Sequence, residues 1–276
     1  MLPVAILAGG LATRLRPVTE KIPKALVEVN GEPFLAHQLR LLASSGIRRV
    51  TMCVGYRAEM IEAYAGDGSR FGVQLTYSPD GPQLRGTAGA IAQARSLLGE
   101  KFFVLYGDSY LPCDYGAVQR AFEESGKPAL MTVYANRDQW DTSNVHFSAG
   151  RILDYSKKLR TPEMHHIDYG LGVFHRAAFN GIPETGAHDL ADLYQALLAR
   201  QELAGFEVGE RFYETGSFAG IRELSEYLAS KAAAAQPCHE HRSPAFIVGA
   251  RRQLRYIVSG AVRFHAADFA KIVDRV

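Results

Sequence analysis

The chain has 276 residues, of which 47% are hydrophobic and 22% charged, and its formal net charge is +2 at pH 7. This composition is typical of a globular protein with one large domain, or one domain with an appendage. The small, scattered basic excess gives no reason to expect nucleic acid as a partner. No apolar stretch approaches the roughly 20 residues of a membrane span, so we expect no membrane contact and a cytoplasmic protein. Three dispersed cysteines, Cys53, Cys113 and Cys238, exclude a disulfide framework and a zinc site.

The first half of the chain alternates segments typical of strands and of helices. We expect strands at 4–8, 50–54, 73–78 and 102–106, and helices near 59–65 and 90–98. A further helix is expected to begin at Pro33, because Phe34, Leu39 and Leu42 then lie on one face. The alternation predicts a Rossmann-like α/β fold, with a mainly parallel sheet and helices on both faces. Ligands of such sheets bind at the carboxyl ends of the strands.

The second half of the chain has shorter strands and more turns. After 129–135, expected strands at 144–147, 151–155 and 169–174 indicate a small β insertion that forms one wall of the ligand site. A helix over 189–200 is expected behind that wall, and Ser217 is expected to cap a helix that ends near residue 234. We predict a main domain over 1–235 and a C-terminal extension over 236–276. The extension packs on that domain or on a second subunit, and the second alternative would make the protein a homo-oligomer.

Residues 7–24 carry the strongest functional signal. Leu7 and Ala8 end the first expected strand, and Gly9 and Gly10 then let the backbone approach a ligand, because glycine has no Cβ. Three cations follow at intervals, namely Arg14, Arg16 and Lys24. Backbone amides at a glycine turn, together with fixed cations, form a site suited to the anionic groups of a polyphosphate.

The same stretch resembles the signature of the sugar-phosphate nucleotidylyltransferases, which join a nucleoside triphosphate to a sugar 1-phosphate. Their pattern runs Gly-Gly-x-Gly-Thr-Arg-Leu-x-Pro-x-Thr and then Pro-Lys, and this chain departs from it at Ala12, where glycine is usual. Residues 3–230 share the resemblance, which within the family is closest to the heptose 1-phosphate guanylyltransferases. It implies an Mg²⁺-dependent enzyme with the nucleotide-diphospho-sugar transferase fold, which releases pyrophosphate.

The implied reaction explains which residue types the site needs. A sugar phosphate oxygen attacks the α-phosphorus of the nucleotide, and it arrives ionised because the second pKa of a phosphate monoester is about 6. No general base is then required, so the protein supplies positioning and charge neutralisation. The resemblance assigns Arg14 to the β- and γ-phosphates, and Lys24 to the region between the α-phosphate and the sugar phosphate.

Two carboxylates are implied as ligands of Mg²⁺. Asp108 follows Gly107 at the end of an expected strand and matches the Gly-Asp of the family. The family brings a second ligand from a Trp/Tyr-x-Asp-x-Gly-Thr segment, and Glu214 takes that place here. Glutamate is one methylene longer, so it keeps an oxygen for a hard cation but changes the ligand geometry. Asp108 also completes the expected catalytic set with Arg14 and Lys24.

The other nucleotide contacts implied by the resemblance lie in three segments of the chain. They are the phosphate turn (Leu7, Ala8, Gly9, Gly10 and Thr13), the Gly-Thr pair beside the base and ribose (Gly86 and Thr87), and Asp80, which lies where base edges are read. Family members differ near Asp80, and Arg85 is unusual before the Gly-Thr pair. The identity of the base therefore stays open.

The sugar-side motifs depart furthest from the family pattern. Where the family has Glu-Lys-Pro and Asn-Ala-Gly-Ile-Tyr, this chain has Lys157-Lys158-Leu159 and Asp168-Tyr169-Gly170-Leu171-Gly172. Lys157 thus replaces a carboxylate that holds a sugar hydroxyl, Asp168 replaces an asparagine, and Gly170 keeps the family glycine. The reversed polarity argues against glucose 1-phosphate, and favours a heptose or a sugar with an extra anionic or amino group.

Two other functions compete with this interpretation. A nucleotide-binding regulatory subunit without catalysis is disfavoured, because Arg14, Lys24 and Asp108 are all retained. A transferase acting on a non-sugar phosphate or phosphonate, such as phosphocholine, would need an aromatic cage, for which Trp140, Tyr155 and Tyr169 are candidates. An NAD-binding oxidoreductase is excluded, because no GxGxxG follows the first expected strand.

Overall fold

The computed structural model describes residues 1–10, 18–81, 83–183 and 185–235. The chain divides into two compact units, Met1–Gln236 and Pro237–Val276, and every described residue belongs to the first. The extension over 236–276 lies outside the described residues, so its packing and a homo-oligomer stay predictions. Within the described ranges, no helix is both long enough and apolar enough to span a membrane.

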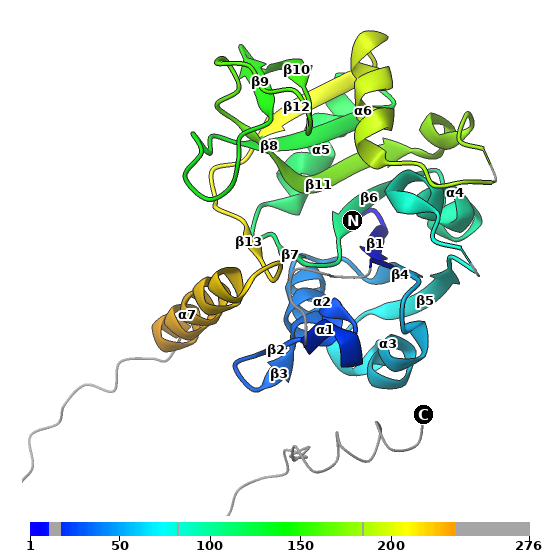
Figure 1. Ribbon diagram of the computed structural model, residues 1–276, viewed down its shortest axis with the longest axis vertical. Helices are drawn as coiled ribbons and strands as arrows, with labels where there is room; N and C mark the ends of the chain where they lie inside the picture. The colour runs from blue at the N-terminus through cyan, green and yellow to red at the C-terminus, as the bar shows by residue number, and fades with distance from the viewer. Residues whose placement is uncertain (11–17, 82, 184, 236–276) are drawn as a thin grey trace, which may run out of the picture. The chain divides into compact units, whose positions relative to one another are not determined.

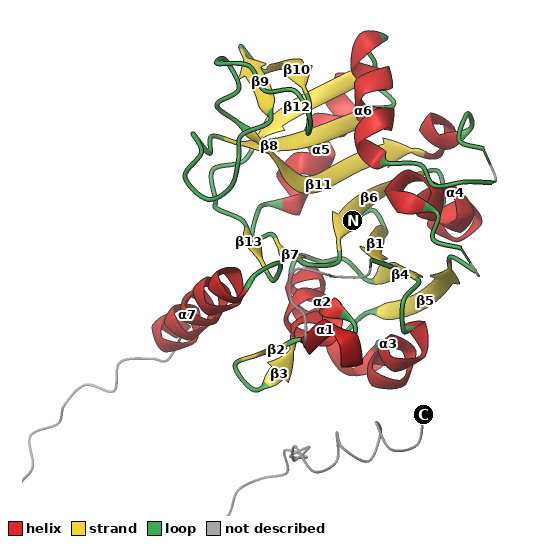
Figure 2. Cartoon of the chain, in the orientation of Figure 1, coloured by secondary structure: helices red, strands yellow, loops and turns green. Residues whose placement is uncertain are grey.

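A seven-stranded sheet organises the first unit (Figures 1 and 2). In spatial order its strands are β12 (Leu203–Glu207), β8 (Ala129–Tyr134), β11 (Ile167–His175), β6 (Lys101–Tyr106), β1 (Val4–Ala8), β4 (Arg49–Val54) and β5 (Gln74–Pro79). β11 pairs antiparallel with both of its neighbours, whereas the other neighbouring strands of this sheet pair in parallel. This arrangement confirms the expected mainly parallel α/β sheet.

Alternating side chains on the central strands divide the core into two layers. On β1, Val4 and Ile6 contribute to one layer and Ala5 to the other, and all three are fully buried. The first layer includes residues of α2 (Phe34–Ser44), α3 (Ala58–Ala65) and α5 (Tyr115–Ser125), and the second those of α4 (Gly86–Leu98) and α6 (Leu190–Ala199). Because successive strand residues point to opposite faces, helices bury the sheet from both sides, as expected.

The remaining elements complete the unit. Three two-stranded sheets pair β2 (Glu28–Val29) with β3 (Glu32–Pro33), β7 (Ser109–Tyr110) with β13 (Tyr213–Glu214), and β9 (Val145–Ser148) with β10 (Arg151–Tyr155). The helices α1 (Val18–Lys21) and α7 (Phe218–Ala235) lie near the two ends of the described chain, and 3-10 turns cover Lys24–Leu26, Ser69–Phe71 and Arg176–Phe179. The Ser217 hydroxyl accepts a hydrogen bond from Gly220 N at 3.1 Å, so it caps α7 as expected. The β9–β10 hairpin is the small β insertion.

The structure corrects the prediction for residues 169–174. We expected this strand in the insertion, but it belongs to β11, which lies between β6 and β8 in the main sheet. Its residues Leu171, Val173 and Phe174 are fully buried, as in a strand covered on both faces. Among the elements of five or more residues, two were not anticipated: α5, which Asp114 caps by accepting from Ala117 N at 3.0 Å, and the edge strand β12.

Candidate active site

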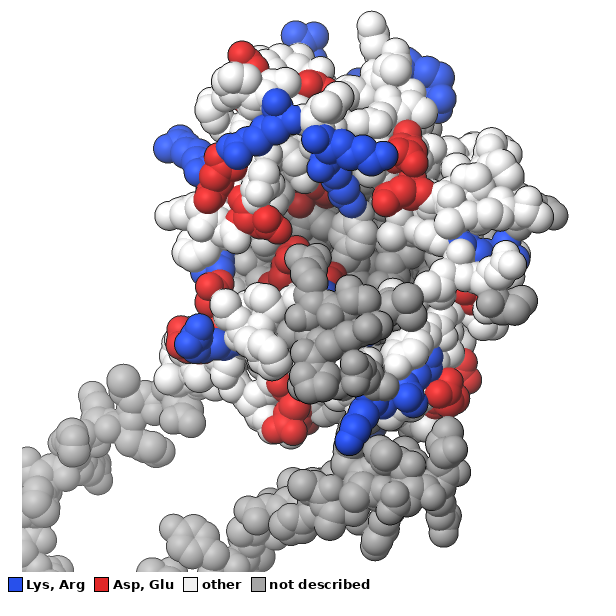
Figure 3. Space-filling model, viewed as in Figure 1, with Lys and Arg blue, Asp and Glu red and all other residues white. Residues whose placement is uncertain are grey.

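A cavity of about 380 Å³ opens at the carboxyl ends of β1 and β6, the edge at which α/β sheets bind ligands. Nine of the expected site residues line it: Leu7, Ala8, Gly9, Gly10, Lys24, Asp80, Gly86, Thr87 and Asp108. The face viewed in Figure 3 is hollowed near its centre, with acidic side chains inside and both basic and acidic side chains along its upper edge. Thr13 and Arg14 lie outside the described residues, so their roles stay predictions.

Gly107 fixes Asp108 beside the first strand. The Gly107 N–H donates to the Leu7 carbonyl oxygen at 2.9 Å, and a Cβ at Gly107 would lie 2.5 Å from that oxygen. Because this distance is far inside van der Waals contact, glycine alone fits here. The end of β6 therefore turns directly against β1, and Asp108 lines the same cavity as Gly9 and Gly10.

Lys24 and Asp108 form an ion pair at the cavity wall. Lys24 begins the 3-10 turn Lys24–Leu26, whereas Asp108 follows β6, so the fold joins residues that are far apart in the sequence. Their side chains are only 17% and 30% exposed, which reduces screening by water. The pair therefore places a cation that can bind a phosphate beside a carboxylate that can bind a metal ion.

Glu214 lies on the strand next to this pair. β13 pairs with β7 so that Glu214 lies opposite Ser109, and Thr215 N donates to the Asp108 carbonyl oxygen at 2.9 Å. A Cβ at Gly216 would lie 3.3 Å from Lys24 Nζ and 3.8 Å from Glu214 Oε2. The three charged groups implied by separate motifs therefore converge.

The Asp108 and Glu214 carboxylates fit a hard divalent cation by their chemistry. Proteins usually hold Mg²⁺ through one or two carboxylates, and substrate phosphates and water complete its coordination. Within the described ranges, no group of three or more His, Cys, Asp or Glu side chains is arranged to hold a metal. For an ion held by these two carboxylates, substrate phosphates and water would supply the remaining oxygen ligands.

The segment after β5 contributes a buried carboxylate to the cavity. Asp80 is 5% exposed, and its Oδ2 would lie 3.1 Å from a Cβ added at Gly9. Burial raises the pKa of the Asp80 carboxyl. Leu7, Cys53 and Leu84 also line the cavity, and burial raises the pKa of the Cys53 thiol to about 12, so this thiol stays protonated. Together they form a largely apolar wall that contains the Asp80 carboxyl, and this wall suits a nucleobase that carries hydrogen-bond donors.

The loop before α6 holds the start of α4. Gly86 has φ +69°, and a Cβ there would lie 2.6 Å from the His188 carbonyl oxygen. The Thr87 hydroxyl donates to Asp189 Oδ1 at 3.1 Å and accepts from Leu190 N at 2.7 Å. The Gly-Thr pair therefore joins two helices in addition to lining the cavity, a role that its motif does not reveal.

Tyr106 connects the cavity to the residues implied on the sugar side. Its side chain lines the cavity, and Lys157 Nζ lies 3.4 Å from its hydroxyl oxygen and 5.3 Å from the centroid of its ring. Gly170 has φ +93°, and a Cβ there would lie 3.4 Å from Cδ2 of the same ring. Lys157 and Gly170 therefore meet at Tyr106, although neither lines the cavity itself.

Asp168 is held by hydrogen bonds from three segments. Its carboxylate accepts from Gly170 N at 3.0 Å and from the Tyr155 hydroxyl at 3.4 Å, and its N–H donates to Asn144 Oδ1 at 2.9 Å. Burial raises the pKa of the Asp168 carboxyl, and the Lys157 ammonium partly offsets this shift. The two residues that reverse the family's polarity therefore act on each other electrostatically.

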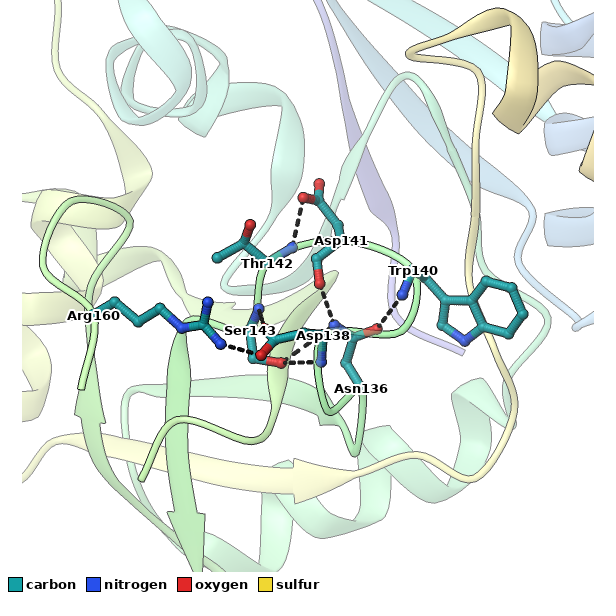
Figure 4. A network of polar contacts seen from close by, with 7 residues as sticks. All are labelled: Asn136, Asp138, Trp140, Asp141, Thr142, Ser143 and Arg160. Carbon is teal, nitrogen blue, oxygen red and sulfur yellow. Dashed lines mark hydrogen bonds and ion pairs between the residues drawn. The ribbon is translucent and has the colours of Figure 1, made fainter. Parts of the chain in front are cut away.

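The loop between β8 and β9 is closed by its own polar network (Figure 4). Asn136 is fully buried, donates to the Ser143 hydroxyl at 3.2 Å and accepts from Trp140 N at 3.2 Å. Asp138 accepts from Ser143 N at 2.8 Å and forms an ion pair with Arg160. These bonds fix the backbone from which Trp140 projects.

Trp140 is not free to form an ammonium cage. The Arg211 guanidinium carbon lies 3.3 Å from the centroid of the Trp140 ring and 4.7 Å from that of Tyr213, next to Glu214. The other two cage candidates, Tyr155 and Tyr169, are each 1% exposed and pack against other rings. The protein's own cation occupies the Trp140 face and joins the loop to β13.

Sequence reasoning missed three residues near the site: Tyr106, Asp189 and Gln38. Tyr106 directly precedes the Gly-Asp pair, so its place at the end of a strand was a usable signal. Asp189 was taken only as the start of a helix. Gln38 is a polar residue on the buried face of α2, 1% exposed, and its position among apolar residues was the signal.

Comparison with known proteins identifies relatives over most of the chain. Residues 4–231 match the family described as Nucleotidyl transferase. The mannose-1-phosphate guanylyltransferase catalytic subunit beta of Drosophila pseudoobscura pseudoobscura is 28% identical over 249 residues, which are 88% of this chain and 65% of that protein. The glucose-1-phosphate thymidylyltransferase of Streptomyces antibioticus is 33% identical over 162 residues, 57% of this chain and 45% of that protein.

A solved structure supports the same fold. HddC from Yersinia pseudotuberculosis, crystallised with GMP-PN, superposes with a TM-score of 0.70 at 22% identity, over 83% of this chain and all of that one. At this identity the likeness shows the fold alone. The chain spans 65% and 45% of the lengths of the two curated relatives.

Proposed function

The chain belongs to the nucleotidyltransferase family of enzymes, and from that premise we propose that it joins a nucleoside triphosphate to a sugar 1-phosphate and releases pyrophosphate. The convergence of Lys24, Asp108 and Glu214 beside a glycine-lined cavity carries this proposal. A cation and two carboxylates at one point suit a reaction in which phosphates and a divalent ion meet.

The chain's own residues act in this reaction by binding and by charge. The backbone at Gly9 and Gly10 leaves room for phosphates to approach, and Lys24 neutralises the oxygen atoms between the α-phosphate and the sugar phosphate. Because the attacking phosphate monoester is already ionised, with a second pKa of about 6, no side chain must remove a proton. Preorganised charge then lowers the barrier, since it does not have to reorganise as the transition state forms.

Asp108 and Glu214 are the residues that would hold Mg²⁺. When bound, the ion would neutralise charge on the reacting phosphate and on the departing pyrophosphate. Removal of divalent cations with EDTA is therefore expected to abolish turnover, and added Mg²⁺ to restore it.

We further propose guanine as the base. The Asp80 carboxylate is an acceptor in an otherwise apolar part of the cavity, and guanine presents two neighbouring donors, N1–H and the 2-amino group, to such a group. The guanylyltransferase among the relatives and the GMP-PN bound to HddC favour the same base. The thymidylyltransferase among the relatives favours thymine instead.

For the sugar we propose a compound other than glucose 1-phosphate, with heptose 1-phosphate as the first candidate. Lys157, which stands where the family has a carboxylate, lies at the Tyr106 ring and beside the charge of Asp168. A sugar hydroxyl that donates to a carboxylate in other family members would meet an ammonium donor here.

A pyrophosphate-release screen tests these proposals together. Five nucleoside triphosphates are combined with a panel of hexose and heptose 1-phosphates, each with Mg²⁺ and with EDTA. We expect release with GTP and a sugar 1-phosphate other than glucose 1-phosphate. If the protein binds nucleotide but releases no pyrophosphate with any combination, the transferase proposal is wrong and the regulatory-subunit interpretation replaces it.

A further inference from the structure

We propose that Gln38 is a positioning residue for Asp108, and that it holds the turn at residues 106–109 in the shape that the metal site requires. The inference rests on the proposed function for the role of Asp108 as a metal ligand. It concerns a residue of α2 that does not line the cavity and that no motif in the sequence marks.

The Gln38 side chain bridges the two ends of this turn. Its Nε2 donates to the carbonyl oxygen of Tyr106 at 3.1 Å and to that of Ser109 at 2.9 Å. Tyr106 is the last residue of β6 and Ser109 the first of β7, so the two bonds flank Gly107 and Asp108. One buried amide thereby fixes the backbone on both sides of the candidate metal ligand.

The other anchors of the turn come from different directions. Gly107 N donates to Leu7 on β1, and the Asp108 carbonyl oxygen accepts from Thr215 N at 2.9 Å. Gln38 ties the same turn to α2, so three elements hold it. Because Ser109 lies opposite Glu214 in the β7–β13 pair, a shift at Ser109 also moves the second carboxylate.

The oxygen atom of the Gln38 amide also supports this role. Gln38 Oε1 is buried and has no hydrogen-bond partner among the residues that the structure describes. A flipped amide would bring this oxygen against two carbonyl oxygens, so the two donor bonds fix its orientation. A buried polar atom without a partner is unfavourable, and an apolar side chain of the same size would avoid it. The two bonds to the turn explain why an amide is present here.

Loss of the amide should therefore weaken metal binding more than nucleotide binding. The Tyr106 and Ser109 carbonyls would lose their partner, and Asp108 and Glu214 would no longer be held at a fixed separation. The phosphate turn at Gly9 and Gly10 and the base contact at Asp80 do not depend on Gln38 for any of the contacts described above. This separates a positioning role from a general loss of structure.

The test is Gln38→Met in the full chain, with Mn²⁺ as the probe. Methionine keeps the size of the side chain and removes both donors. Electron paramagnetic resonance of free Mn²⁺, in the presence of GTP and corrected for the Mn²⁺ that GTP alone binds, is expected to show binding about 10- to 100-fold weaker than in the wild type. GTP binding in EDTA, measured by calorimetry, is expected to be unchanged, and the Mg²⁺ concentration for half-maximal turnover should rise by the same factor as the Mn²⁺ dissociation constant.

Leu42→Ala is the matched control. Leu42 lies one helical turn after Gln38 on the buried face of α2 and is fully buried, so its truncation destabilises the helix packing without touching the turn. We expect a lower melting temperature and unchanged Mn²⁺ binding. If Gln38→Met does not fold, Gln38→Asn carries the test, because its shorter amide cannot span both carbonyls and should weaken Mn²⁺ binding several-fold.

Each remaining outcome decides the inference. Mn²⁺ binding at the wild-type level in a folded Gln38 variant overturns the inference. So does a loss of Mn²⁺ binding in Leu42→Ala equal to that in Gln38→Met, or a wild-type protein that binds no Mn²⁺. If the wild type binds Mn²⁺, the Gln38 variants lose it and no substrate pair releases pyrophosphate, the proposed function fails while the positioning role stands.

Discussion

The proposed nucleotide side and the proposed sugar side of the site are built in different ways. On the nucleotide side, glycines allow the backbone itself to form the wall: Gly107 contacts Leu7, Gly86 contacts His188, and Gly9 lies against Asp80. On the sugar side, side chains from separate strands and loops meet at Tyr106, with Lys157 above the ring and Asp168 held by Tyr155 and Asn144.

This difference explains why the sugar side departs further from the family pattern than the nucleotide side does. A wall made of backbone tolerates few substitutions, because a Cβ at Gly107 or Gly86 would collide with a main-chain oxygen. A wall made of side chains can change its polarity while the strands stay in place. Substitutions on the nucleotide side should therefore abolish the reaction, and those on the sugar side should redirect it.

The largest expected effect tests the nucleotide side at the proposed metal site. Asp108→Ala should lower the rate of pyrophosphate release by about 100-fold or more, because a fixed charge at the transition state is lost. Glu214→Ala should have a comparable effect if both carboxylates hold the ion. Asp114→Ala is the control: it removes the cap of α5 and about 1 kcal/mol of stability, and it should leave the rate unchanged. A rate for Asp108→Ala within tenfold of the wild type would contradict the assignment.

The next effect separates two cations on the same side. Lys24→Ala should lower kcat by about 10- to 100-fold with little change in KM, because its contact strengthens as the α-phosphate reacts. Arg14→Ala should change kcat and KM together, since Arg14 is assigned to the leaving pyrophosphate. The exposed Lys21 offers a control of the same charge. Variants that raise KM alone would show that these cations bind substrate without stabilising the transition state.

A smaller effect tests whether the sugar side redirects the reaction. Lys157→Glu restores the family's acceptor at Tyr106, and it should raise kcat/KM for glucose 1-phosphate, relative to the natural sugar, by about ten- to a hundredfold. Lys158→Glu makes the same charge change on the next residue, which is also exposed, and should leave this ratio unchanged. An unchanged ratio in Lys157→Glu would show that the sugar is selected elsewhere.

The smallest effect concerns Asp168, a half-buried carboxyl whose charge interacts with the Lys157 ammonium. Burial raises the pKa of Asp168 in the folded state, so its ionised form opposes folding at neutral pH. As the pH falls through that raised pKa, the folded carboxyl becomes protonated and the penalty disappears. Asp168→Asn, which carries no charge, should therefore stabilise the protein slightly at a pH of about 7, with less advantage at about 5. Urea unfolding at both pH values measures the difference, and a destabilised variant at the higher pH would show that the Lys157 attraction outweighs burial.

Periodicity in the sequence was sufficient to predict the alternating half of the fold. The strands β1, β4, β5 and β6 and the helices α3 and α4 lie within a few residues of their expected bounds, and α2 begins next to Pro33, where its start was expected. Residues 169–174 were expected in the insertion because the chain around them is rich in turns. Their place in the main sheet depends on pairing with β6 and β8, which are distant in sequence, and no local pattern carries that information.

The sequence by itself determined the polyphosphate motif and the residue types at the site. Glycines, cations and carboxylates at fixed spacing can be recognised there, because each is required by the local backbone or by the charge of the ligand. Tertiary structure alone decided which of them meet. Lys24 reaches Asp108 across the sheet edge, Lys157 acts on Asp168, and the Arg211 guanidinium covers Trp140. Gln38 is a further example. The sequence shows a glutamine on an apolar helix face, but its role can be inferred only once α2 packs against the turn that carries Asp108. Contacts of this kind depend on how strands and helices pack over long sequence separations, and a linear pattern does not encode those distances.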